Sequence, residues 1–431
     1  MLPPPALTFT IPSIHDDTTL LDCRIYHPAS LAPNQLAPVW RKHAAIVAHP
    51  YATLGGSYDD AVVETVSAAL LREGYVVGTF NFRGAGNSTG KTSWTGKAER
   101  GDYMSFAGFV AYYVHYLDPF RPQSEPRSPA SVSMPTNELA GNMNAVLLLC
   151  GYSYGAMITQ HLPPLTELLV PFATPPTASA AADIRLRAQH LAEKQNTILA
   201  SARLAASTSH RHNAFGGMRV GGDEDPRRSQ EHGSRRSFSM DAEEKIRKGV
   251  AELMRAAKGG HHLGAHHRDK KGNRAGQKHV KEMSESAQQV ETKEPETLPA
   301  VEDLVVPRVA YLLVSPPVGW ATNLMTMNMG GFFGKRPKTP KTKNAGATAS
   351  RDTAEMLKLV ENPTLAIYGD ADIFVAVKKF REWASKMQAE PGSKFRAHEI
   401  STAGHFYVEQ GTLQRLAEAV KAFSGELAAS E

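Results

Sequence analysis

The sequence predicts an α/β protein with a mostly parallel central sheet and helices on both faces. Apolar runs of strand length alternate with segments of helical spacing through most of the chain, as in parallel sheets. The run AVLLLC at residues 145–150 is apolar throughout, which predicts a strand buried on both faces.

Length and composition agree with a globular protein. The 431 residues allow one large or two ordinary domains, and 42% hydrophobic with 21% charged residues is typical of globular proteins. The two cysteines, Cys23 and Cys150, cannot build a disulfide framework, and no apolar stretch approaches the roughly 18 residues of a membrane-spanning helix. The N-terminus lacks the features of a signal peptide. We therefore expect a cytoplasmic protein without a membrane span.

Residues 1–170 are expected to form the N-terminal part of the core. Strands are predicted at residues 7–11, 18–26, 43–48, 75–82 and 145–150, and helices at 59–72, 97–117 and 156–170. Pro163 and Pro164 should kink the last helix or end it early, and Ser57 is a candidate N-cap for the first. Residues 118–142 read as a Pro- and Ser-rich connection.

Residues 171–304 differ in composition and are expected to form a basic, His-rich, disordered insertion. Residues 171–300 carry a net charge of about +6 and few aromatic residues, although residues 182–204 and 241–257 have helical character. A lid, a partner- or nucleic-acid-binding arm and a regulatory segment are alternatives to a solvated loop. The histidine pairs at 261–262 and 266–267 lack cysteine partners, so no metal site is expected, and basic charge without interleaved aromatic residues argues against nucleic acid.

Residues 305–431 are expected to complete the core. Strands are predicted from about residue 308, within 363–375 and at 394–401, with helices at 354–359, 378–387 and 413–423. An acidic turn follows the second of these strands, and the loop at residues 402–406 follows the third.

The pentapeptide Gly-Tyr-Ser-Tyr-Gly after the apolar run predicts a nucleophile elbow centred on Ser153. Gly151 and Gly155 leave room where strand and helix approach closely. The pentapeptide is weak evidence alone, so the rest of a catalytic site has to be sought elsewhere in the chain.

Candidates for the base and its orienting carboxylate follow two later strands. The order Ser153, Asp372, His405 is the order of the α/β-hydrolase architecture, and carboxyl ends of parallel strands meet at one edge. Asp372 is favoured over Asp370, which is expected to bind its own loop backbone. His405 is favoured over His49, which is placed to shape the loop after the third strand.

Two main-chain amides are candidates for an oxyanion hole. The amide of Tyr154, after the nucleophile, is one. Pro50 has no N–H, so Tyr51 is the first possible donor in the loop after the third strand, and Ala52 is the alternative.

The glycine-rich turn GAGNSTG at residues 84–90 invites comparison with a dinucleotide-binding loop. Its glycines are spaced one residue too far apart for G-x-G-x-x-G, and no helical pattern follows directly. We interpret it as a structural turn and expect no cofactor.

These motifs resemble those of the α/β-hydrolase superfamily. The chain is similar to the subgroup with a His-Pro loop, an Asn-Phe-Arg-Gly turn and a final Gly-His-Phe-Tyr loop, here at residues 49–50, 81–84 and 404–407. The resemblance covers residues 7–170 and 305–425. Members of the subgroup resemble carboxylesterases, dienelactone-type hydrolases and serine peptidases. The resemblance implies Ser153, Asp372 and His405 as the triad.

The function expected is that of a carboxylesterase-like serine hydrolase, acting on a carboxylic ester, thioester or small amide. The alternative is a catalytically inactive interaction protein of the same fold that binds a partner through its insertion. The sequence does not indicate an oligomeric state.

Overall fold

The computed structural model describes residues 1–33, 39–93, 95–120, 145–214, 296–317 and 357–430. One sheet of eight strands runs through them in the order β1-β2-β4-β3-β5-β6-β7-β8. The strands are β1 (Leu7–Pro12), β2 (Leu20–Tyr26), β3 (Ala44–Ala48), β4 (Val76–Phe80), β5 (Val146–Tyr152), β6 (Arg308–Val314), β7 (Thr364–Gly369) and β8 (Phe395–Ile400).

The sheet is mostly parallel, as predicted. Only β2 runs against its neighbours β1 and β4, and the pairs from β4 through β8 are all parallel. Every residue of β3, β4 and β5 is buried, which explains their continuous apolar sequences. The parallel strands therefore end together at one edge of the sheet.

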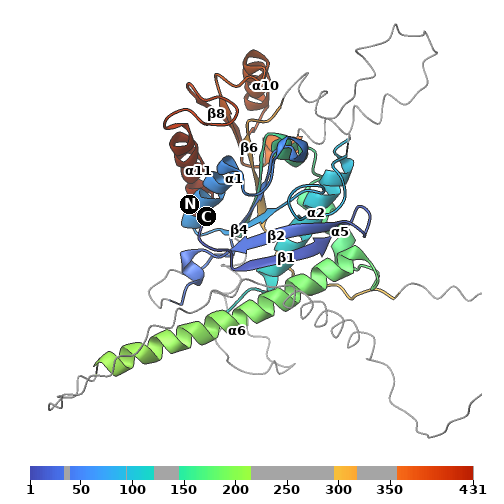
Figure 1. Ribbon diagram of the computed structural model, residues 1–431, viewed down its shortest axis with the longest axis vertical. Coiled ribbons are helices and arrows are strands. Elements are labelled where there is room, and N and C mark those ends of the chain that lie inside the picture. The colour runs from blue at the N-terminus through green and yellow to red at the C-terminus, as the bar shows by residue number, and fades with distance from the viewer. Residues whose placement is uncertain (34–38, 94, 121–144, 215–295, 318–356, 431) are drawn as a thin grey trace, which may run out of the picture.

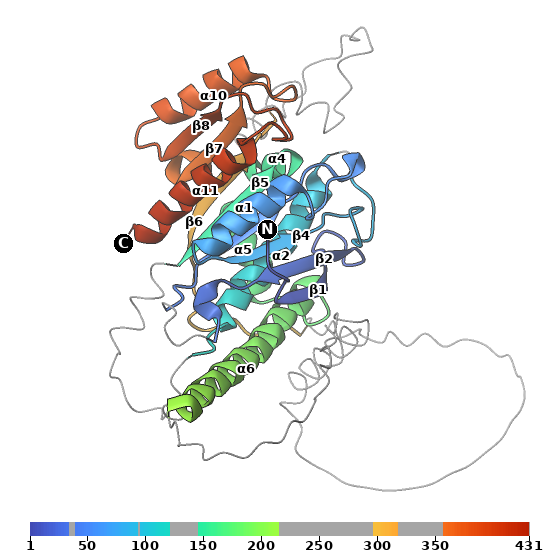
Figure 2. The ribbon, with the colours of Figure 1, turned by 60° about the vertical axis from the view of Figure 1, so that its left-hand side comes forward.

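Helices cover both faces, as Figures 1 and 2 show. The α-helices are α1 (Ala61–Arg72), α2 (Lys97–Tyr116), α4 (Tyr154–Gln160), α5 (Leu165–Ala173), α6 (Ala180–Ala214), α10 (Val377–Ala389) and α11 (Thr412–Ala429), with short 3-10 turns η1 (Ala29–Leu31) and η2 (Ala52–Leu54) and a helical turn at 357–361. Apolar side chains of α1 and α11 form the core on one face, and those of α2, α4, α5, α6 and α10 form the core on the other. The predicted fold class is confirmed.

The start of α1 and the end of α4 can be compared with the sequence predictions. The N-cap of α1 is Asp60, whose side chain accepts the Val62 amide, so Ser57 is not the cap as proposed. Helix α4 ends at Gln160, ahead of Pro163 and Pro164, and α5 begins as a separate helix at Leu165.

The long helix α6 lies in the stretch expected to be an insertion. It was expected at residues 182–204 and spans Ala180–Ala214, and its N-terminal half packs against α2 with Ile184 and Leu191 completely buried. Leu298 is also buried in this core, and Thr177 pairs with Glu296 through the main chain. The N-terminal half of α6 and Leu298 therefore pack with the core. The helix expected at 241–257, the histidine pairs and most of the 118–142 connection lie outside the described residues.

Within the described part of the chain, no helix is long and apolar enough to cross a membrane.

Candidate active site

Ser153 occupies a strained turn between β5 and α4. Its φ is 54° and ψ is −114°, a conformation that residues with a side chain rarely adopt. A Cβ on Gly151 would lie 2.3 Å from the Gly155 carbonyl carbon, and one on Gly155 would lie 2.5 Å from the Ala48 carbonyl oxygen. The two glycines thus allow the turn, which has the form of a nucleophile elbow.

The loops that follow β7 and β8 pack directly on each other. The Ala371 amide donates to the Ala403 carbonyl at 3.1 Å. At Gly369 a Cβ would lie only 2.0 Å from the same carbonyl oxygen, so the contact requires glycine there. This contact brings the loop of Asp372 beside the loop of His405.

The structure brings Ser153, His405 and Asp372 together in one hydrogen-bonded row. His405 Nε2 lies 2.8 Å from Ser153 Oγ, and His405 Nδ1 lies 2.8 Å from Asp372 Oδ2. All three side chains are buried: the exposed fractions are 3% for Ser153, 6% for His405 and 5% for Asp372. Burial removes competing water, so each hydrogen bond in the row is stronger than it would be in solvent.

The partners determine which imidazole nitrogen carries the proton. The Asp372 carboxylate also accepts the amides of Phe374 and Val375 at Oδ1, which fixes its orientation. A carboxylate only accepts hydrogen bonds, so Nδ1 of His405 is protonated and Nε2 is free to accept the Ser153 hydroxyl proton. This is the tautomer that a general base requires.

The loop of His405 is held by two tyrosines. The Tyr152 hydroxyl donates to the His405 carbonyl at 2.8 Å, and Tyr407, at φ 52°, pairs its hydroxyl with Ser315 Oγ at 3.1 Å. Burial raises the pKa of both hydroxyls, so they stay protonated. The rings of Phe374 and Tyr152 pack 4.8 Å and 5.5 Å from the imidazole. These contacts fix the histidine from several directions.

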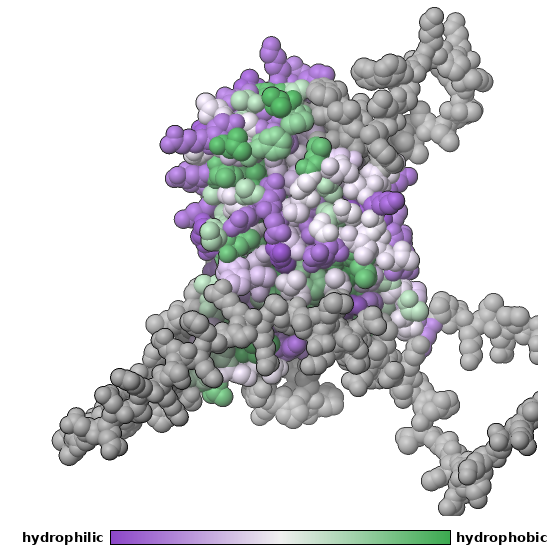
Figure 3. Space-filling view, in the orientation of Figure 1, coloured by the Kyte–Doolittle hydropathy of each residue, from purple (hydrophilic) through white to green (hydrophobic). Residues whose placement is uncertain are grey.

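Exposed apolar side chains lie close in sequence to Asp372 and His405. Ile373 is 77% exposed, Phe406 57% and Val408 82%, and all three are one to three residues from Asp372 or His405. Figure 3 shows hydrophobic side chains among hydrophilic ones over β8 and α10, the part of the molecule that carries these loops.

Asp370 lies apart from the imidazole. Its carboxylate accepts the Thr402 amide at 2.6 Å and the Ser401 hydroxyl at 3.4 Å. It was expected to bind its own loop, and it instead binds the loop after β8. Asp370 therefore ties the two loops together.

His49 has both ring nitrogens engaged away from Ser153. Nε2 accepts the Phe82 amide at 2.8 Å, and Nδ1 lies 2.6 Å from the Pro50 carbonyl oxygen. The side chain is completely buried, and burial lowers its pKa to about 4. His49 is thus a neutral histidine that contacts the loop after β3.

The two candidate oxyanion donors belong to neighbouring residues. Tyr154 is the first residue of α4, where an amide has no partner within the helix. Tyr51 precedes η2, and its ring centroid lies 5.0 Å from that of Tyr154. Ala52, the alternative, is the first residue of η2.

No group of three His, Cys, Asp or Glu side chains among the described residues is arranged to hold a metal ion. In the turn at residues 84–90 the Gly84 amide donates to the Thr89 carbonyl, and all three glycines have positive φ. The next helix, α2, begins only at Lys97.

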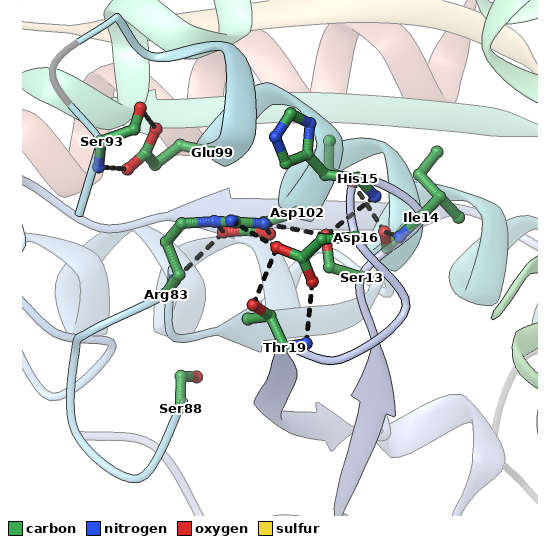
Figure 4. A network of polar contacts seen from close by, with 12 residues as sticks. Ser13, Ile14, His15, Asp16, Thr19, Arg83, Ser88, Ser93, Glu99 and Asp102 are labelled. Atoms are coloured by element: carbon green, nitrogen blue, oxygen red, sulfur yellow. Dashed lines mark hydrogen bonds and ion pairs between the residues drawn. The ribbon is translucent and has the colours of Figure 1, made fainter. Parts of the chain in front are cut away.

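Sequence reasoning missed the buried ion pair behind this site. Arg83 of the Asn-Phe-Arg-Gly turn makes two hydrogen bonds to Asp102 of α2, at 2.6 and 2.9 Å, and reaches Asp16 at 2.8 Å (Figure 4). An arginine directly after an apolar strand, with an acidic residue in the first turns of the next helix, was the available signal.

Comparisons with known proteins give structures of α/β serine hydrolases. No protein-family model matches the sequence, and no curated protein matches it. An α/β serine hydrolase homologue from Coxiella burnetii is 14% identical over 98% of this chain and 99% of its own, with a TM-score of 0.40. A lidless α/β serine hydrolase from Xanthomonas campestris is 15% identical over 98% and 95%, with a TM-score of 0.38. Est1E from Butyrivibrio proteoclasticus, with ferulic acid bound, is 11% identical over 97% and 99%, with a TM-score of 0.40.

The chain has a mostly parallel eight-stranded sheet, an elbow after β5, and Ser153, Asp372 and His405 after β5, β7 and β8. This arrangement is the α/β-hydrolase fold.

Proposed function

We propose that this protein is a serine hydrolase that cleaves a carboxylic ester, thioester or small amide through an acyl-enzyme intermediate. Ser153 is the nucleophile, His405 the general acid and base, and Asp372 the carboxylate that orients the imidazole. The single observation that carries the proposal is the row Ser153–His405–Asp372, with both links at 2.8 Å.

The chemistry follows from the tautomer of His405. Ser153 Oγ attacks the carbonyl carbon while its proton passes to Nε2, which gives an imidazolium beside the Asp372 carboxylate. The same proton then goes to the leaving oxygen, sulfur or nitrogen as the tetrahedral intermediate collapses. Water repeats the two steps on the acyl-enzyme and restores the serine hydroxyl.

The negative charge of the tetrahedral intermediate needs donors outside the triad. In the proposal these are the main-chain amides of Tyr51 and Tyr154, which belong to residues in ring contact beside the elbow. No metal or cofactor takes part.

A carboxylesterase-like preference for apolar substrates is part of the proposal. The exposed Ile373, Phe406 and Val408 border the triad loops, where they would contact the acyl or alcohol group of a bound ester. Membership of the His-Pro subgroup is also proposed, supported by the hydrogen bond between His49 of the first motif and Phe82 of the second. A cytoplasmic location is supported by the two free, buried cysteines, Cys23 and Cys150.

Turnover of p-nitrophenyl esters of graded acyl length, a p-nitroanilide and an acyl thioester tests the proposal. We expect ester hydrolysis by the wild type and its loss in Ser153→Ala. A folded wild type that hydrolyses none of these substrates would contradict the proposal.

A further inference from the structure

We infer that His49 is a positioning residue that orients the Pro50–Tyr51 peptide, and with it the Tyr51 N–H, toward the oxyanion. The inference rests on the proposed function and adds to it the residue that sets one of its two oxyanion donors. It is carried by the hydrogen bonds of both imidazole nitrogens.

The tautomer of His49 follows from its partners. The Phe82 amide can only donate, so Nε2 of His49 accepts this bond and carries no proton. Nδ1 is then protonated and donates to the Pro50 carbonyl oxygen, 2.6 Å away. The imidazole therefore acts as a rigid bridge between the turn after β4 and the loop after β3.

The bond to Pro50 sets the direction of the next N–H. The Pro50–Tyr51 peptide is trans, so the Pro50 C=O and the Tyr51 N–H belong to one plane and point in opposite directions. An imidazole that holds the carbonyl on one side thereby directs the amide to the other. The Tyr51 carbonyl is fixed too, since it accepts the amides of Leu54 and Gly56, both at 3.1 Å.

The turn after β4 holds the other end of the same loop. Asn81, next to Phe82, accepts the Tyr58 amide at its Oδ1 at 2.9 Å. Consecutive residues of this turn therefore contact the first and last residues of the 49–58 loop.

The turn is itself fixed by the buried ion pair of Figure 4. Asp102 Oδ2 accepts both the Arg83 amide, at 3.1 Å, and Arg83 Nε, at 2.9 Å. Asp102 is completely buried and Arg83 is 5% exposed, so this contact is shielded from water. The Phe82 amide, one residue earlier, is thus presented to His49 from a rigid turn.

Two substitutions separate the two bonds of His49. His49→Asn keeps an N–H near the position of Nδ1 but removes the acceptor for the Phe82 amide. His49→Gln offers an oxygen near the position of Nε2 but removes the donor to Pro50. We expect kcat for p-nitrophenyl acetate to fall roughly 10- to 100-fold in His49→Gln, with KM little changed, and only a few-fold in His49→Asn.

Thermal stability should follow the opposite order. His49→Asn leaves the buried Phe82 amide unpaired and should have the lower Tm of the two. His43 provides the matched control, because it is also a buried histidine that accepts a strand amide, that of Val146 at 3.2 Å, but lies before the start of β3. His43→Gln should change Tm without changing kcat.

A lower kcat in His49→Gln together with a lower Tm in His49→Asn would support the positioning role. Losses of kcat that follow Tm in all three variants, or an unchanged kcat in His49→Gln, would overturn it while the proposed function stands. A wild type without turnover contradicts the proposed function itself, and the positioning role then falls with it.

Discussion

The Tyr152 hydroxyl donates a 2.8 Å hydrogen bond to the main-chain carbonyl of His405. The residue directly before the proposed nucleophile therefore holds the loop that carries the proposed base. Tyr152→Phe removes this bond and keeps the ring, so we expect a roughly 3- to 10-fold lower kcat and a stability loss of about 1–3 kcal/mol, since the buried carbonyl loses its donor.

Tyr112→Phe is the control for Tyr152→Phe. Tyr112 is buried and donates to the Phe172 carbonyl at 2.9 Å, on the helical layer of α2 and α5. It should lose similar stability and keep kcat. Equal effects of the two variants on kcat would show that Tyr152 has no special relation to the site.

Asp372→Asn should abolish most activity while Asp370→Asn should not. An asparagine amide facing Nδ1 would favour the wrong imidazole tautomer, and we expect kcat to fall by about 10³- to 10⁴-fold. Asp370 contacts Thr402 and Ser401 instead, so its substitution should change kcat by less than about tenfold through loop displacement. Steady-state kinetics on one ester decides between them, and the reverse order would make Asp370 the orienting carboxylate.

Acid should destabilise the protein between about pH 6.5 and about pH 4. Burial lowers the pKa of both His43 and His49 from 6.5 to about 4, so in this range the unfolded chain binds protons that the folded chain does not. Each histidine then lowers the free energy of unfolding by up to about 1.4 kcal/mol per pH unit as pH falls. Urea unfolding at pH 7, 6 and 5 measures the slope.

His43→Gln should reduce this slope, because it removes one of the buried histidines with a lowered pKa, which include His27 as well as His43 and His49. A free energy of unfolding that is constant or rises on acidification would contradict the assignment of neutral, buried histidines.

The N-terminal half of α6 should be essential to the fold. Ile184 is completely buried in the core beside α2, so Ile184→Ala should cost about 2–5 kcal/mol of unfolding free energy. Leu204 on the same helix is 67% exposed, and Leu204→Ala should change stability by no more than about 0.5 kcal/mol. Equal, small effects would mean that α6 does not contribute to the stability of the core.

The sequence was sufficient for the sheet and for the identity of the candidate residues. Continuous apolar runs mark the buried strands β3 and β5, and chain order alone put Asp372 and His405 after neighbouring strands. These are local patterns in the sequence. Because the strands are parallel, the residues that follow them lie at the same edge of the sheet.

The remaining features depend on tertiary contacts. A helix was expected at residues 182–204, but the low average hydropathy of α6 gave no sign that its few apolar positions are buried against α2. Which carbonyl or amide a buried side chain would meet, as for Tyr152, Asp370 and His49, follows from loops far apart in sequence. The hydrophobic periodicity of the sequence does not predict such hydrogen-bond partners.

The most direct test of the account is the site of covalent labelling by a fluorophosphonate, mapped by peptide mass spectrometry. The account predicts one phosphonyl adduct, on Ser153, formed by the wild type, lost in Ser153→Ala and strongly slowed in His405→Ala. A folded, unlabelled wild type, or an adduct on another residue that persists in Ser153→Ala, would contradict the claim that Ser153 is an activated nucleophile.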